Sequence, residues 1–185
     1  MGLFALRYSL LPAQKERRLF ELKRITAGGI PGALEKAERY RLLNDPAAAE
    51  SICLDILDQD PDNQPALEML LLARTDQFAD TMAAGVAQAR EALGRLTDPF
   101  HRAYYAGLLH ERRAKALLLA GRPGSSHMAY DAFREAMEHY EKAERLSPPG
   151  NDDARLRWNT CARILNQTPH LVPRPEERLE PTLGE

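Results

Sequence analysis

The sequence predicts an all-α fold built from antiparallel pairs of helices, and three observations support this prediction. Ala and Leu dominate the composition while aromatic residues make up only 6%, which favours helices over sandwiches and barrels. Apolar residues recur with the period of a helix in several short segments. Prolines at 61, 99 and 148 follow such segments, with spacings of 38 and 49 residues. The sequence therefore predicts short helices separated by sharp turns.

Composition narrows the class of protein further. Hydrophobic residues make up 44% and charged residues 28% of the 185 residues, so a soluble core can form and global disorder is not expected. The formal net charge of −2 indicates neither a nucleic-acid-binding nor a membrane-surface protein. No apolar run reaches the length of a membrane span, and no signal peptide is recognisable. We expect a cytoplasmic protein with two buried, reduced thiols, Cys53 and Cys161.

Residues 1–29 form a predicted basic N-terminal arm. Before position 27 it holds six basic and two acidic side chains. Residues 13–26 have the composition of one basic helix, and Gly28 and Gly29 then interrupt the pattern. Such an arm can dock on the rest of the chain or attract an anionic partner.

A helical repeat domain is predicted over residues 30–167. Pro31 stands near the first turn of its first helix. Asn44, Asp45 and Pro46 form a turn whose side chains can cap the second helix. The second helix has one apolar stripe and stops at Asp60–Pro61, because the residue before proline is pushed out of the helical region. Its stripe consists of Ala49, Ile52, Cys53, Ile56 and Leu57.

Four more segments have the apolar periodicity of helices and end at turn residues. The segment from 64 to 75 is apolar on more than one face, which suits a helix between two neighbours. The next carries its stripe from 82 to 96 and is expected to stop at Asp98–Pro99. A long segment over 100–120 leads to a loop at 121–126, and a further stripe from 133 to 143 ends at Ser147–Pro148.

The C-terminal part is predicted to hold one last helix and a tail. Residues 152–165 contain the only tryptophan, Trp158, and are amphipathic. Residues 168–185 are rich in Pro and Glu and lack periodicity, so we expect an extended tail there.

The chain resembles the tetratricopeptide repeat (TPR) family. Residues 33–63 match best, with small, aromatic, turn and closing positions occupied by Ala37, Tyr40, Asn44, Asp45, Ala49, Leu57, Asp60 and Pro61. A second match covers the second helix of a later repeat, with Phe133, Ala136, Tyr140, Ala143, Leu146 and Pro148. The sequence departs from the family pattern at Ala33, Lys36 and Ile56, and the longer second proline interval requires an insertion, expected in the loop at 121–126.

This resemblance implies a right-handed α-solenoid of about three TPR-like repeats with a C-terminal capping helix. In this family the first helices of the pairs line a concave groove that binds a partner peptide or helix. The resemblance therefore implies a protein–protein interaction module, an adaptor or scaffold, whose partner-binding residues are Glu38, Arg41, Leu72, Tyr105 and Arg112. Tyr and Arg suit such a role because they bury large areas and donate hydrogen bonds.

The sequence contains no recognisable catalytic or metal-binding motif. His110–Glu111 begins like the metalloprotease pattern HExxH, but Ala114 stands where the second histidine ligand belongs. The glycines at 28, 29 and 32 lack the Lys-Ser/Thr of a phosphate-binding loop. We therefore expect no enzyme activity, no cofactor and no metal.

Two other functions remain open at the level of sequence. The last helix could pair with a second copy of the chain through Trp158, unless the proline-rich tail covers it, because a terminal repeat normally ends in a polar cap. The basic residues at 15–24 could contact nucleic acid, although Phe20 is the only aromatic residue there and such binding would have to weaken steeply with salt.

Overall fold

The computed structural model describes residues 20–174, with the side chains of 80–83 excepted. Over these residues the chain is entirely helical apart from its connections, with no strand. A short 3-10 turn at Ala27–Gly29 precedes seven α-helices. They are α1 (Ile30–Leu42), α2 (Pro46–Gln59), α3 (Gln64–Asp76), α4 (Phe78–Gly94), α5 (Pro99–Ala120), α6 (Ser125–Leu146) and α7 (Asp153–Gln167). The predicted all-α class is confirmed.

Three of these helices begin with the same local chemistry. The side chains of Asp45, Asn63 and Asp98 accept a hydrogen bond from the backbone N–H three residues later, at 3.1, 3.0 and 2.8 Å. A proline follows each cap within the first two helical positions of α2, α3 and α5, where its missing N–H leaves no hydrogen bond unmade. Asp98–Pro99 therefore begins α5. It does not end α4 as predicted, since α4 already ends at Gly94.

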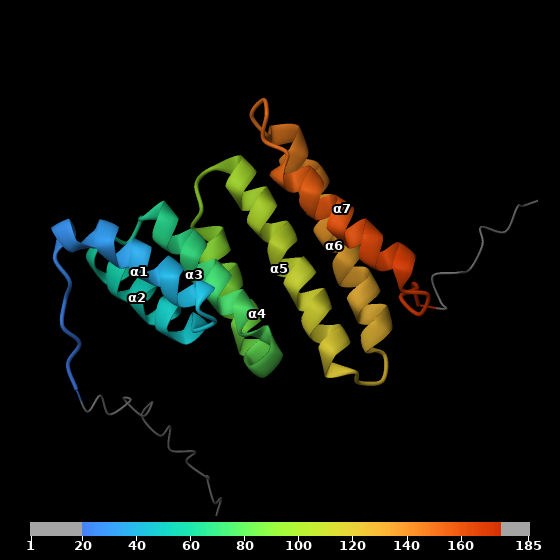
Figure 1. The fold of residues 1–185 in the computed structure, drawn as a ribbon, viewed down its shortest axis with the longest axis horizontal. Helices are drawn as coiled ribbons and strands as arrows, with labels where there is room; N and C mark the ends of the chain where they lie inside the picture. The colour runs from blue at the N-terminus through green and yellow to red at the C-terminus, as the bar shows by residue number, and fades with distance from the viewer. Residues whose placement is uncertain (1–19, 175–185) are drawn as a thin grey trace, which may run out of the picture.

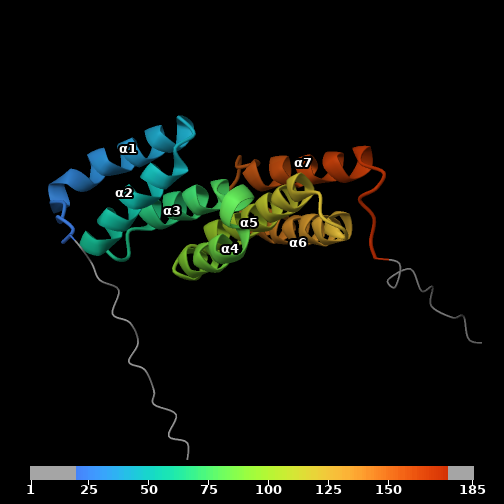
Figure 2. The same ribbon diagram turned by 90° about the horizontal axis from the view of Figure 1, so that it is seen from below.

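The helices follow one another along the long axis of the molecule, from α1 and α2 at one end to α6 and α7 at the other (Figures 1 and 2). Each helix packs on the next one in the chain. The odd-numbered helices also touch in order, α1 with α3, α3 with α5 and α5 with α7. Helix α3 therefore has both α1 and α5 as neighbours, and α5 has both α3 and α7.

Small residues lie buried where neighbouring helices pack, and Ala37 and Ala49 are at positions predicted from the sequence. Ala37 on α1 and Ala49 on α2 are fully buried, which lets the two helix backbones approach. Farther along, Gly107 on α5 faces the ring of Tyr140 on α6, where a Cβ would lie 2.6 Å from the ring atom Cε1. Tyr104 packs against the core of the first helices and against that of the last three, so the two cores are continuous through α5.

Helices α5 and α6 accommodate the extra residues of the longer proline interval within their own lengths. The predicted insertion site, the loop between α5 and α6, is only residues 121–124, with Gly121 and Gly124 at positive φ of 58° and 79°. Instead, α5 and α6 have 22 residues each, against 13 and 14 for α1 and α2. The expected insertion in the loop is wrong because good helix formers such as Ala and Leu extend α5 to its end.

The two ends of the described chain differ from each other. Residues 20–26 are not helical, so the expected basic helix is absent there, and its positions 13–19 lie outside the described residues. After α7 the chain packs back on the helices. Leu171 is 4% exposed in the core of α5, α6 and α7, and the Nδ1 atom of His127 lies 2.9 Å from the carbonyl oxygen of Val172. The first residues of the predicted tail thus cover part of the last helices.

No helix among the described residues combines the length and apolar character needed to cross a bilayer.

Candidate functional site

Four of the five predicted partner-binding residues meet on one side of the structure. Arg41 on α1 and Tyr105 and Arg112 on α5 contact carboxylates of α3. Leu72 on α3 joins them only through its backbone carbonyl, because its side chain packs against the core of the first helices. Glu38 lies exposed on α1, one turn before Arg41. We call this surface the odd-helix face and define it by residues Glu38, Arg41, Glu68, Leu72, Asp76, His101, Tyr105 and Arg112.

Asp76, the last residue of α3, joins two of the predicted residues. Its Oδ2 atom lies 2.6 Å from Nε of Arg41, and its Oδ1 atom lies 2.6 Å from Nη1 of Arg112. Arg112 also donates to the carbonyl oxygen of Leu72 at 2.9 Å and to the hydroxyl of Thr75 at 2.6 Å. These contacts satisfy carbonyl and hydroxyl groups at the end of α3 and hold α1, α3 and α5 together through charge-assisted bonds.

Glu68 forms the second junction of the odd-helix face, two turns before Asp76 on α3. The hydroxyl of Tyr105 donates to its Oε2 atom at 3.2 Å, and Nδ1 of His101 lies 2.7 Å from its Oε1 atom. Burial, reinforced by the negative charge of Glu68, raises the pKa of Tyr105 above its ordinary value. The hydroxyl therefore stays protonated and remains a hydrogen-bond donor.

The two α3 carboxylates are functional candidates that sequence reasoning missed. Glu68, Leu72 and Asp76 are spaced by four residues and so share one face of α3, opposite His101, Tyr105 and Arg112 on α5. That spacing is visible in the sequence, but the residues that pair with Glu68 and Asp76 lie 33 to 37 residues away. Because Arg41 and Arg112 already pair with the carboxylate of Asp76, the odd-helix face offers a balanced, prearranged set of hydrogen-bond donors and acceptors.

A second cluster lies inside the last three helices around Glu111 of α5. Glu111 is 1% exposed. Its Oε2 atom accepts from the hydroxyl of Tyr140 at 2.7 Å, and its Oε1 atom lies 2.6 Å from Nζ of Lys115 and 3.4 Å from Nη1 of Arg157. A buried carboxylate is costly unless it is paired and hydrogen-bonded, and here α5, α6 and α7 each supply a partner.

The chemistry of this cluster favours a structural role. Burial first, and then the charge of Glu111, raises the pKa of Tyr140 above its ordinary value, so the hydroxyl stays protonated and can donate to Glu111. The sequence shows Glu111 next to His110 at the start of an incomplete metal motif and shows Tyr140 on an apolar stripe. A buried tyrosine hydroxyl needs a hydrogen-bond partner. The position of Tyr140 on an apolar stripe is therefore the one sequence feature that could have predicted its pairing with a polar residue such as Glu111.

The cysteines do not add a redox site to the described structure. Cys53 and Cys161 are both buried and free, as predicted. Burial raises the pKa of each thiol to about 12. Because the thiolate is the reactive form, neither side chain is suited to act as a nucleophile.

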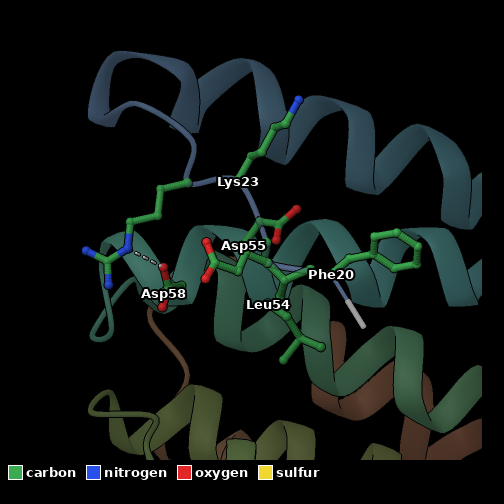
Figure 3. Close-up of a pocket in the computed structure, with 8 residues that line it drawn as sticks. Phe20, Lys23, Leu54, Asp55 and Asp58 are labelled. Atoms are coloured by element: carbon green, nitrogen blue, oxygen red, sulfur yellow. Dashed lines mark ion pairs between the residues drawn. The ribbon is translucent and has the colours of Figure 1, made fainter. Parts of the chain in front are cut away.

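A hollow of about 680 Å³ lies between the segment 20–24 and α2 (Figure 3). Phe20 and Leu54 border it together with Lys23, Asp55 and Asp58, and Arg24 pairs with Asp58 at 3.1 Å. The Phe20 side chain is 85% exposed. Because Phe20 is the first described residue, the hollow opens at the boundary of the described chain, and we assign it no ligand.

Comparisons with known proteins do not identify a family for this chain. Family models, curated proteins and solved structures give no match to this chain. Within the described residues, no group of three or more His, Cys, Asp and Glu side chains is arranged to hold a metal ion.

Proposed function

We propose that this protein is a non-catalytic protein–protein interaction module, a TPR-like adaptor or scaffold that binds a partner peptide or helix on the odd-helix face. The observation that carries the proposal is that Arg41 and Arg112 meet at Asp76 and that Tyr105 meets Glu68. Arg41, Tyr105 and Arg112 were predicted from the resemblance, and Glu68 and Asp76 of α3 are added by the structure.

The packing order supports a solenoid of antiparallel pairs as the architecture of this module. In such an array each pair contacts only its neighbours, and the first helices of successive pairs line one surface. Here the pairs are α1–α2, α3–α4 and α5–α6, with α7 as the cap. The contacts of α1 with α3, α3 with α5 and α5 with α7 are those that this arrangement requires.

The charge balance of the odd-helix face indicates how a partner is recognised. A surface with a large excess of one charge would select partners mainly by sign. On this face the guanidinium groups of Arg41 and Arg112 are held by Asp76, with side chains that are 21% and 17% exposed. We propose that the partner supplies polar groups that join this existing hydrogen-bond pattern, with Tyr105 as a prearranged aromatic contact.

Capture of partners from a native lysate tests this proposal. The purified full chain is compared with a Glu38→Gln/Tyr105→Phe variant, which removes one exposed charge and one hydroxyl while it keeps every guanidinium contact. Arg134→Gln, an exposed change on α6, is the matched control. We expect a protein that is retained by the wild type and by Arg134→Gln and is weakened or lost in the double variant. Equal retention by all three forms would place the interface elsewhere and refute the odd-helix face as the binding surface.

Self-association through the last helix is the second candidate function. Leu156 on α7 is 61% exposed, which favours an additional contact there. Trp158 is less available than predicted, because it packs against the core of α5, α6 and α7 and donates to Glu141 at 3.0 Å. Light scattering over a range of concentrations decides this point, since a concentration-independent monomer excludes self-association.

Contact with nucleic acid through the basic arm is a third proposal. Most of the basic residues at 15–24 lie outside the described residues. A fluorescence titration with single-stranded DNA at several salt concentrations tests it, because phosphate contacts require affinity to fall steeply with salt.

A further inference from the structure

A second surface lies on the other side of α5 from the odd-helix face. It is a cleft of about 440 Å³ between α4, α5 and α6. On α5 it is bordered by Pro99, Arg102, Ala103 and Ala106. Helical periodicity puts Ala103 and Ala106 roughly opposite Tyr105 and Arg112, so a ligand in the cleft would not touch the odd-helix face.

The floor of this cleft is apolar and made of small side chains. Ala103 and Ala106 are 4% and 7% exposed, and Leu93 and Gly94 of α4 stand beside them. Side chains no larger than a methyl group let a ligand come close to the α5 backbone. The volume falls within the range of about 300 to 1,000 Å³ that is usual for ligand sites.

The rim of the cleft carries one cation from each of its three helices. These are Arg90 on α4, Arg102 on α5 and Lys142 on α6, and no carboxylate is among the lining residues in the described part of the chain. The whole chain has a net charge of −2, so this concentration of positive charge does not follow from composition. Acidic neighbours exist on α6, where Glu135 and Glu138 act on His139, but they lie outside the lining.

One of these cations is already held in place. Arg102 donates through Nε to the carbonyl oxygen of Leu96 at 3.0 Å and through Nη2 to that of Thr97 at 3.3 Å. Carbonyl oxygens are neutral, so they orient the guanidinium group without cancelling its charge. A prearranged charge loses less entropy when it meets an anionic group.

We propose that the α4–α5–α6 cleft binds an acidic peptide segment of a partner protein in which carboxylates flank one or two leucine-sized side chains. The apolar side chain would occupy the floor at Ala103 and Ala106, and the carboxylates would meet Arg90, Arg102 and Lys142. Nucleic acid fits less well, because sequence-independent binding of single strands relies on aromatic stacking and, among the described lining residues, His139 has the only aromatic ring.

A peptide selection tests the proposal with defined probes. A random library of displayed twelve-residue peptides is selected against the immobilised full chain, and the enriched peptides are synthesised with a fluorescent label. Their dissociation constants are then measured for the wild type and for Arg90→Glu/Lys142→Glu. The control Arg134→Glu/Arg163→Glu makes the same change of charge at exposed positions outside the cleft. Circular dichroism verifies that all three forms fold alike.

The expected result is an enrichment of peptides rich in Asp, Glu and Leu. Their affinity should fall about tenfold or more in the cleft variant, the equivalent of about 1.4 kcal/mol, and should change little in the control. A Glu38→Gln/Tyr105→Phe variant should bind them normally, which separates this cleft from the proposed function of the odd-helix face.

Four outcomes would overturn the proposal. The selection could yield no acidic peptide, or peptides that bind the cleft variant as well as the wild type. A single-stranded DNA probe could bind more tightly than the peptides with the same dependence on Arg90 and Lys142, which would assign the cleft to nucleic acid. Finally, the peptides could bind only to a full chain that carries Glu176→Gln/Glu177→Gln/Glu180→Gln. That result would identify the chain's own acidic C-terminal segment as the occupant of the cleft.

Discussion

Replacement of Gly107 by alanine tests whether the contact between α5 and α6 depends on the absence of a side chain. A Cβ atom at this position would lie 2.6, 2.7 and 3.0 Å from the ring atoms Cε1, Cδ1 and Cζ of Tyr140. These separations are far below van der Waals contact. Tyr140 is fully buried, so its ring cannot swing into solvent. Either the ring or the α5 backbone has to move.

The expected magnitude follows from three contributions. Overpacking of a well-packed core costs about 1 to 3 kcal/mol. A shift of the ring also strains the 2.7 Å hydrogen bond from Tyr140 to the buried carboxylate of Glu111, and an unsatisfied buried acceptor costs about 1 to 3 kcal/mol. Alanine itself favours a helix over glycine by about 1 kcal/mol. We expect Gly107→Ala to lower the free energy of unfolding by at least about 1 kcal/mol.

Urea denaturation followed by far-ultraviolet circular dichroism measures this change. Gly32→Ala in α1 is the matched control, because nothing lies within 4 Å of its Cβ position, and it should be neutral or stabilising by up to about 1 kcal/mol. In a Tyr140→Leu background the ring is absent, so Gly107→Ala should no longer be destabilising. The reasoning fails if Gly107→Ala is as stable as the wild type, or if its cost is unchanged in the Tyr140→Leu background.

Three further predictions concern single interactions. Tyr140→Phe removes one donor to Glu111 and should cost about 1 to 3 kcal/mol in urea denaturation; no loss would show that the buried carboxylate does not need this bond. Asp45→Ala removes the cap of α2 and should lower the melting temperature, with a cost of about 1 kcal/mol, whereas Asp45→Ser should restore most of it. Burial, with help from Lys142, lowers the pKa of His139 below 6.5. The unfolded chain then binds the proton more readily, so stability should fall as the pH falls from 6.5 towards the folded-state pKa, and His139→Gln should weaken that fall in melting temperatures measured across this range.

Local features of the fold were predictable because their causes are local. The turn at 44–46 and the stop at Asp60–Pro61 depend on backbone preferences of a few neighbouring residues, and both stand in the structure as predicted. The predictions were wrong where one local sequence pattern is compatible with two different structures. An Asp-Pro pair is compatible with the end of one helix or with the start of the next. In the structure Asp98 caps the start of α5. Extra residues between two prolines can lengthen a loop or a helix, and here they lengthen α5 and α6.

The sequence by itself determined the helical class, the turns at 44–46 and 60–61, the burial of both cysteines and the small residues at the first helix crossing. All of these follow from periodicity and from the properties of neighbouring residues. Only the tertiary structure decided which charges meet. Arg41 and Arg112 converge on Asp76 from positions more than 30 residues away, and Glu111 finds partners on three helices. Such pairings depend on the rotation and crossing of whole helices, which no short segment of sequence specifies.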